Sequence, residues 1–316
     1  MAYSRRIQRT RASTSTCRRR RSRSPLSALL LAGVLPITSG RATTRLTQFH
    51  NFAQAGTAYV KASQVVLDEA GNAAIEADSL IAQKGRDGLR TADERREFIV
   101  AENQELRKRL LLREIGRHGR LLQSYFETLA ALADPKAPAT LGTAAQGVFD
   151  SIGRLSPAIK NASLGGVRIQ DHIPQATNFV VQVFKVKALE NELKVRSKAI
   201  EREIALQEGA FSVISSTLET DLTAKLQLEE TQDVIEPFAA AKDLPKSWAA
   251  SREEILRARV AASSARAAQD ATAKLRESFV ALVENRLSEP SIAGIIAAIN
   301  SMLNSTEAIK KATPTQ

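Results

Sequence analysis

The three histidines of this sequence have the widest chemical range, because an imidazole can transfer protons or bind a metal. They are His50, His118 and His172. Glu114 lies one helical turn before His118 and could supply half of a metal site. A ferritin-like di-iron bundle, however, needs Glu-x-x-His spacings on several helices, and none of the three histidines has one. An exposed or salt-bridged pair is therefore the expected role of Glu114 and His118.

Asp171 and His172 follow a Gly-rich loop and could do acid–base chemistry. Because Pro174 comes shortly afterwards, capping of the next helix by Asp171 is a simpler explanation. The sequence has no Gly-x-x-x-x-Gly-Lys-Ser/Thr, Gly-x-Gly-x-x-Gly or Gly-x-Ser-x-Gly motif. Phosphate cradles and serine nucleophile elbows therefore have no support. We expect a protein that is not an enzyme and that uses no metal or cofactor.

The most strongly charged stretch, 94–120, contains eight basic and five acidic residues. Four of its arginines fall on one face of a predicted helix, where they could contact an anionic lipid, polysaccharide or nucleic acid. A solvated face with ion pairs inside the helix is the alternative. This four-arginine face consists of Arg109, Arg113, Arg117 and Arg120.

The net charge of +11 is concentrated at the N-terminus. Residues 1–40 hold nine arginines and no acidic residue, so the rest of the chain has a net charge of +2. A body so close to neutral lacks most of the electrostatic attraction that dominates non-specific nucleic-acid binding. We therefore expect no nucleic-acid partner for the mature body.

Residues 1–40 have the order of a secretory signal, since arginines precede an apolar run and small residues follow it. The run, 26–35, has Ser27 as its one polar residue, and its ten residues make about 15 Å of helix, half of a membrane core. We expect cleavage near Arg41 and a periplasmic or secreted bacterial protein. A mitochondrial presequence and an uncleaved basic tail are the alternatives. If the leader is removed, Cys17 leaves with it, and the mature chain has no disulfide.

The body has few aromatic residues, 4% of the chain, and is rich in Leu, Ile, Val and Ala, which favours helices. Thr91 and Glu94 have the spacing of a capping box that begins a helix. Within the long helical pattern after Pro174, Gly209 is the one obvious place for a kink or a break. Apolar steps of three, four and seven predict helices within 46–83, 94–134, 140–162, 174–236, 256–283 and 289–303.

These patterns predict an all-α fold, an elongated antiparallel bundle of five or six long helices with coiled-coil-like packing behind a cleavable N-terminal leader. No strand-like alternation is present. Because no clear linker divides the body, we expect one domain over 41–316, with a segment richer in Gly and Pro at 135–170. The apolar stripe at 186–226 could meet a partner as a coiled coil, or be buried within the chain itself.

The sequence therefore predicts an exported protein with a structural or protein-interaction role in the periplasm or cell envelope, where its partner is an unknown protein. The alternative is a membrane-active helical protein, surface-associating or similar in principle to helical pore-formers. In that case 139–166 or 292–303 would unpack and insert. The apolar run at 292–299 is too short to span a membrane alone, which limits it to weak contact with the membrane surface.

Overall fold

The chain divides into two units, Met1–Ala42 and Thr43–Gln316, and all described residues belong to the second. The predicted leader at 1–40 and its cleavage near Arg41 lie outside the described residues. The computed structural model describes residues 45–85, 91–134, 136–138, 140–183, 186–240, 243–262 and 266–312.

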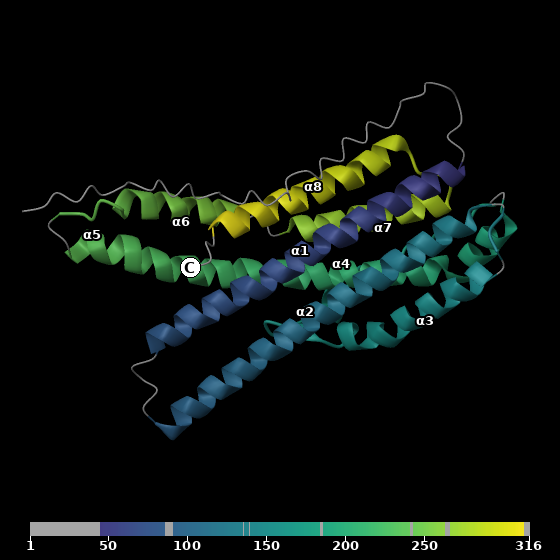
Figure 1. Cartoon of the computed structure of the whole chain (residues 1–316). Helices are drawn as coiled ribbons and strands as arrows, with labels where there is room; N and C mark the ends of the chain where they lie inside the picture. The colour runs from purple at the N-terminus through teal and green to yellow at the C-terminus, as the bar shows by residue number, and fades with distance from the viewer. Residues whose placement is uncertain are drawn as a thin grey trace, which may run out of the picture. The chain divides into compact units, whose positions relative to one another are not determined.

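Most described residues are helical, so the predicted all-α fold is confirmed (Figure 1). Thr91 and Glu94 form the predicted capping box at the start of the second helix. Ser288 caps the last helix, because its hydroxyl accepts a hydrogen bond from the Ser291 amide at 3.3 Å. The long helices in the described part are α1 (Arg45–Gly85), α2 (Ala92–Leu132), α3 (Thr140–Lys160), α4 (Lys187–Glu230), α6 (Trp248–Ala262), α7 (Ala267–Val283) and α8 (Glu289–Ala312).

These seven helices exceed the predicted five or six, because the stretch predicted as one helix, 256–283, contributes to both α6 and α7. The stretch that includes the end of α6, Ala-Ala-Ser-Ser-Ala at 261–265, has no large apolar side chain that could anchor a helix to its neighbours. α6 and α7 each pack against α4 and α8 (Figure 1).

The central helix of the packing is α4, which contacts α1, α2, α3, α6 and α7. All eight residues of 204–211 are buried, so this part of α4 is covered on every face. The apolar stripe at 186–226 is buried within the chain, from Leu189 (0% exposed) to Leu226 (2%). Of the two uses predicted for this stripe, the structure shows the internal one.

α4 continues through Gly209 without a break. A Cβ atom built at Gly209 would lie 3.0 Å from the Cα, N and Cγ1 atoms of Ile173. The irregular segment 173–183 runs along α4 from that point, and the Thr177 amide donates to Glu201 farther along the helix at 3.3 Å. Gly209 is thus a site of close backbone approach, and the predicted pattern after Pro174 becomes helical only at Lys187.

The Gly-rich loop contains a minimal hairpin, an exception to the expectation of no strand. Ser163–Leu164 (β1) pairs antiparallel with Val167–Arg168 (β2). The two residues between them, Gly165 and Gly166, have φ values of +56° and +80°. A two-residue turn with two positive φ values suits glycine, because a Cβ atom would be strained there.

The short helix η3 (Ile169–His172) follows the hairpin. Asp171 lies inside it and accepts a hydrogen bond from Arg168 Nε at 3.0 Å, and the next helix begins only at Lys187. The prediction that Asp171 caps a helix near Pro174 is therefore wrong. The Asp171 carboxylate bonds the side chain of the arginine three residues before it, and no long helix starts there for it to cap.

The C-terminal end of α4 continues into a wider turn, η4 (Thr231–Ile235), and then into α5 (Glu236–Ala240). Pro237 has no amide hydrogen, and its ring would clash with the carbonyl four residues earlier in an α-helix. The π-type turn avoids the clash, and the Glu236 amide donates to the Thr231 carbonyl. The helix therefore passes this proline without a break.

Candidate functional site

His118 is fully buried, with its ring among side chains of α2, α3 and α4. The amide Nε2 of Gln207 lies 2.7 Å from His118 Nδ1, and His118 Nε2 lies 3.1 Å from Glu203 Oε2. The Ser156 hydroxyl donates to the same Glu203 oxygen at 2.5 Å. The cluster therefore combines a serine, a histidine and a carboxylate, the residue types of nucleophilic catalysis.

The hydrogen bonds in this cluster fix the state of the imidazole. Gln207 Nε2 also donates to the carbonyl of Ile115 at 3.1 Å, so this atom is the amide nitrogen and His118 Nδ1 must accept from it. Nε2 then carries the proton and donates to Glu203. Activation of a serine requires the opposite, an unprotonated imidazole nitrogen facing the hydroxyl. This arrangement joins three helices and does not activate Ser156.

The predicted pair of Glu114 and His118 is not formed. Glu114 instead pairs with Arg117 on the same helix, at 3.9 Å, and both side chains are exposed. His50 and His172 lie elsewhere, on α1 and η3, and both are exposed. Among the residues that the structure describes, no group of three His, Cys, Asp or Glu side chains could hold a metal ion.

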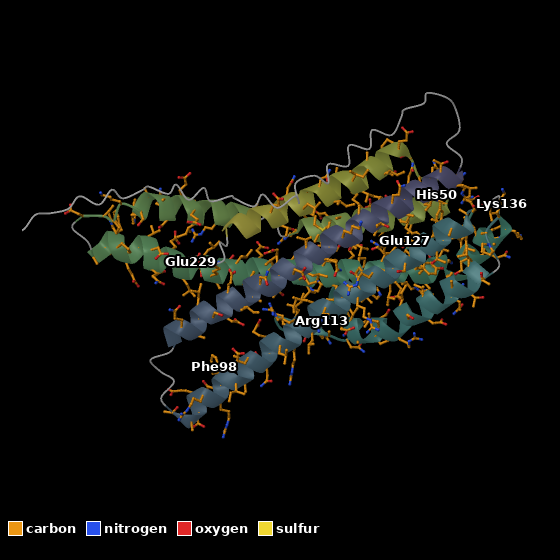
Figure 2. The ribbon with its side chains drawn as sticks, in the orientation of Figure 1. His50, Phe98, Arg113, Glu127, Lys136 and Glu229 are labelled. Carbon is orange, nitrogen blue, oxygen red and sulfur yellow. The ribbon has the colours of Figure 1, made fainter. Side chains whose placement is uncertain are left out.

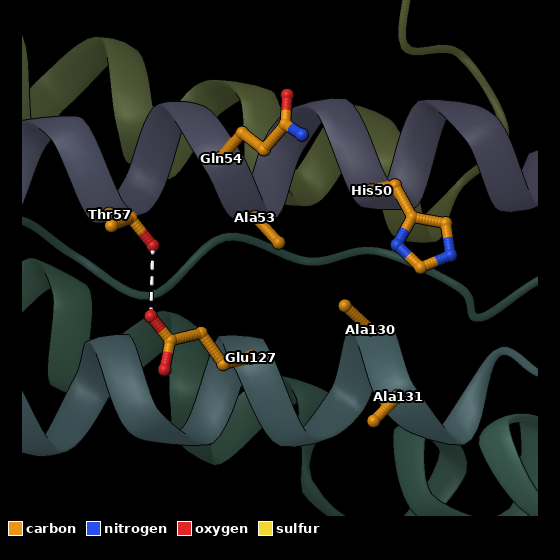
Figure 3. A pocket seen from close by; sticks show the side chains of 7 residues that line it. All are labelled: His50, Ala53, Gln54, Thr57, Glu127, Ala130 and Ala131. Carbon is orange, nitrogen blue, oxygen red and sulfur yellow. Dashed lines mark hydrogen bonds between the residues drawn. The ribbon is translucent and has the colours of Figure 1, made fainter.

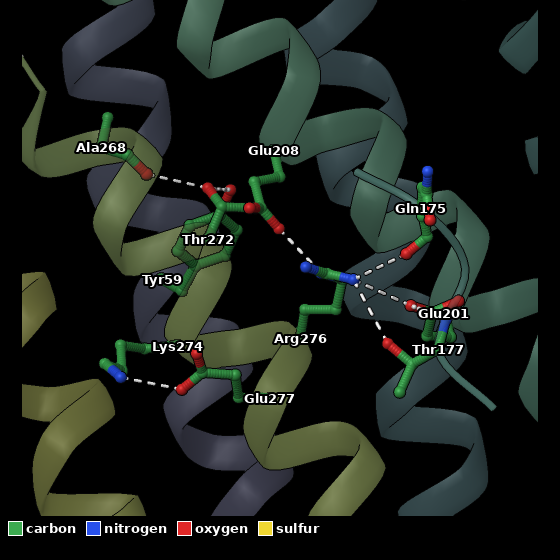
Figure 4. A network of polar contacts seen from close by, with 10 residues as sticks. All are labelled: Tyr59, Gln175, Thr177, Glu201, Glu208, Ala268, Thr272, Lys274, Arg276 and Glu277. Carbon is green, nitrogen blue, oxygen red and sulfur yellow. Dashed lines mark hydrogen bonds and ion pairs between the residues drawn. The ribbon is translucent and has the colours of Figure 1, made fainter. Parts of the chain in front are cut away.

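A second polar cluster joins α7 to α4 and to the segment 173–183 (Figure 4). Arg276 donates to Glu208 at 2.8 Å and to Glu201 at 3.1 Å, and Glu201 is only 1% exposed. Burial raises the pKa of Glu208, although the Arg276 guanidinium opposes the shift. Burial disfavours the charge of Arg276, but the two carboxylates raise its pKa overall. The single Arg276 guanidinium pairs with both carboxylates and offsets the charge of one of them inside the protein.

A hollow of about 420 Å³ lies between α1 and α2 (Figure 3). Its space exists because several lining residues are alanines, with small side chains. At one end Thr57 donates to Glu127 at 3.1 Å, and at the other end lies the exposed ring of His50. The polar groups stand at the exposed rim and do not converge on one point. The hollow is lined by His50, Ala53, Gln54, Thr57, Glu127, Ala130 and Ala131.

All members of the four-arginine face are exposed on α2. Arg120 donates to the side chain of Gln64 on α1, and Arg117 forms the exposed pair with Glu114. Arg113 lies on the surface farther toward the N-terminus of the helix (Figure 2). The face therefore shows ion pairing within the helix and also leaves basic groups accessible to an anionic partner.

The N-terminal half of α2, residues 92–110, has no buried residue, and we call it the α2 arm. The apolar steps within 94–134 predict one continuous stripe along this helix. Burial in α2 instead begins at Leu112. Figure 2 shows Phe98 near the end of the arm. Its large exposed apolar side chains are Phe98 (40% exposed), Ile99 (59%), Val100 (51%), Leu106 (56%) and Leu110 (48%).

Two polar residues connect the α2 arm to the rest of the fold. Lys108 donates to Asp221 of α4 at 2.9 Å and to Glu105 at 3.4 Å. Burial raises the pKa of Glu105 to about 7, and a side-chain hydrogen bond with Asp78 of α1 contributes to the shift. Burial at this position therefore favours the neutral form of the Glu105 carboxyl.

No family model matches the chain, and no curated protein or solved structure is significantly similar to it.

The two segments of the membrane alternative each bury an apolar face in the fold. In α3, Ala145, Ile152 and Ile159 are buried. In α8, the apolar stripe is buried from Ile292 to Met302, and the helix contacts α1, α6 and α7. No helix in the described part of the chain is both long and apolar enough to cross a membrane. Insertion of either segment would first expose these side chains to water.

Proposed function

We propose that this chain is an exported, non-enzymatic helical-bundle protein with a structural or protein-interaction role in the periplasm or cell envelope. The observation that carries this proposal is the α2 arm, which buries no residue in the fold while exposing five large apolar side chains. Most of the stability of a protein helix comes from packing of an apolar face. A helix whose apolar face is unused within its own chain is suited to contact another protein.

The polar clusters support a role without catalysis. The His118 and Arg276 clusters form their hydrogen bonds and ion pairs within the fold, between helices. The hollow beside His50 has its polar groups on an exposed rim, where water would compete with any reacting group. The chemistry of these residues is therefore used to hold helices together.

The four-arginine face supports a protein partner that carries acidic groups, since it lies on the same helix as the arm. Rim charges of this kind speed association and select partners more than they add affinity. They would also permit weak contact with an anionic membrane surface. The near-neutral charge of the body, +2 without residues 1–40, argues against nucleic acid.

Export is tested by the N-terminal sequence and intact mass of the protein recovered from soluble and membrane fractions of its host. A cut near Arg41 in a soluble fraction supports the proposal. An intact N-terminus at Met1 or Ala2 would overturn export and return the nine leader arginines to the working protein.

The interaction role is tested by a photo-reactive residue placed at Ile99 of the α2 arm, in cells. Val195 of α4, which is 72% exposed, is the matched control position. We expect covalent protein adducts from position 99 and none from position 195. Absence of adducts at position 99 would contradict the interaction role. Binding of the purified protein to anionic vesicles at low salt, with leakage, would favour the membrane-active alternative instead.

A further inference from the structure

The exposed apolar face of the α2 arm has the spacing of a short coiled coil. Ile99 and Leu106 occupy d positions of a heptad, and Asn103 and Leu110 occupy a positions. All four residues are exposed, and we call them the seam. An asparagine at one a position between apolar neighbours is a feature that specifies register in paired helices.

The seam faces away from the rest of the fold. At 3.6 residues per turn, its four residues lie within about 60° of one another around the helix axis. Glu105 and Lys108, which contact α1 and α4, lie on the opposite side of the helix. A second helix could therefore pack against the seam without displacing the contacts of Glu105 and Lys108.

The charges beside the seam are complementary to those of a second copy. Glu102 and Arg109 occupy g positions, and Arg107 and Glu114 occupy e positions. In a parallel pair, each g residue faces the e residue five positions later on the other helix. Glu102 would face Arg107 of the second copy, and Arg109 would face Glu114. Both pairs, and both of their symmetry mates, are of opposite charge.

We propose that the α2 arms of two copies of this chain pair as a short parallel coiled coil. The proposal rests on the proposed function, because it names the partner of the arm as a second copy. In the single chain, the Asn103 amide donates to the carbonyl of Ile99 at 2.7 Å. In the parallel pair, the two Asn103 side chains meet and can hydrogen-bond each other, whereas in an antiparallel pair each would face Leu106.

The pair is short because of Arg113, which occupies the next d position and would face its own copy. Like charges at that position end the seam after Leu110. Two heptads bury little area, so we expect a dimer that dissociates on dilution.

The mass of the purified full chain, measured by light scattering or sedimentation over a range of concentrations, tests self-association. We expect the mass to rise toward twice the monomer value of 34.3 kDa. Leu106→Glu should weaken the dimer by at least about tenfold, since two carboxylates would face each other at a d layer. Val195→Glu, at another exposed apolar position, should leave dimerisation unchanged. A monomer at every concentration would overturn the proposal, as would equal effects of the two variants.

Two further variants test the parallel arrangement. Glu102→Arg should weaken the dimer, and addition of Arg107→Glu should restore it. Recovery with Arg109→Glu instead would indicate antiparallel helices and overturn this register. In a Cys17→Ser background, Asn103→Cys should form a disulfide-linked dimer under mild oxidation, because the two a positions are adjacent. Failure to cross-link in the dimer would also overturn the parallel register.

Failure of this inference can be distinguished from failure of the proposed function. If the chain is monomeric while Ile99 cross-links to a different protein in cells, self-pairing is wrong and the interaction role stands. If the arm neither self-associates nor forms adducts in cells, both are wrong.

Discussion

Substitution of Gly209 by alanine tests the packing of the segment 173–183 on α4. The added Cβ would lie 3.0 Å from three atoms of Ile173, two of them in the backbone. Overpacking of this kind costs about 1–3 kcal/mol. Alanine has a better helix propensity than glycine, which stabilises the folded state by about 1 kcal/mol. Because backbone atoms yield less readily than a side-chain end, we expect a net loss of about 1–2 kcal/mol in the free energy of unfolding.

Gly147 in α3 provides the matched control, since a Cβ built there meets nothing within 4 Å. The same substitution, Gly147→Ala, should stabilise the protein by about 0.5–1 kcal/mol through helix propensity alone. Urea unfolding followed by circular dichroism measures both, and an unchanged dependence on urea shows that the unfolded states are comparable. If Gly209→Ala stabilises the protein as much as Gly147→Ala does, the close approach of Ile173 is refuted.

Three further predictions concern the buried polar groups. The free energy of unfolding should fall as the pH rises from about 5 to above 7, because the folded chain holds Glu105 protonated up to a pKa of about 7, against 4.5 when unfolded. Glu105→Gln should flatten this slope in urea titrations, and an unchanged slope would contradict the assignment. Arg276→Met should cost about 3–5 kcal/mol by leaving two carboxylates buried without a partner, and a loss below about 1 kcal/mol would disprove that role. Adding Glu201→Gln and Glu208→Gln should recover part of this loss. His118→Phe should cost about 1–3 kcal/mol for each hydrogen-bonding group left unpaired, and thermal unfolding with no shift would exclude a structural histidine.

Local signals in the sequence were sufficient for most helices. The Thr91 capping box marks the start of α2 within a residue, and the apolar steps from Leu46 place α1 almost end to end. Both signals depend on residues close together in the chain, which is why the sequence alone can give them.

The wrong or missing predictions depend on contacts between distant residues. A glycine within a helical pattern indicates a weak point of the helix. Glycine is needed at position 209, however, because the backbone of Ile173, thirty-six positions earlier, lies against it. The spacing on one helix pairs His118 with Glu114. The actual partners of His118, Gln207 and Glu203, are far away in the sequence and come close only when the chain folds. No periodicity in one segment carries this information.

The exposure of the α2 arm was missed for a related reason. A helical stripe predicts that one face is apolar, but it does not say whether the chain supplies anything to cover that face. The high charge density of 94–120 was the available signal, since a helix with charges on most of its surface packs few residues. We assigned that signal to the four-arginine face alone, although the apolar residues of the arm lie in the same stretch.

The polar clusters explain how a core with few aromatic residues holds its helices in one register. Alanine and leucine faces bury area without specifying how far one helix slides along another. The buried pairs are specific, and each joins different elements: Tyr59 bonds Thr272 across α1 and α7 at 2.7 Å, and Tyr125 donates to Glu192 across α2 and α4 at 2.8 Å. A slide by one helical turn, about 5.4 Å, would break such pairs and leave charged or polar groups buried without partners. Each pair adds little to the free energy of unfolding, but a misaligned packing that leaves its groups unpaired is strongly destabilised. These contacts therefore select one packing among the many that the apolar pattern allows.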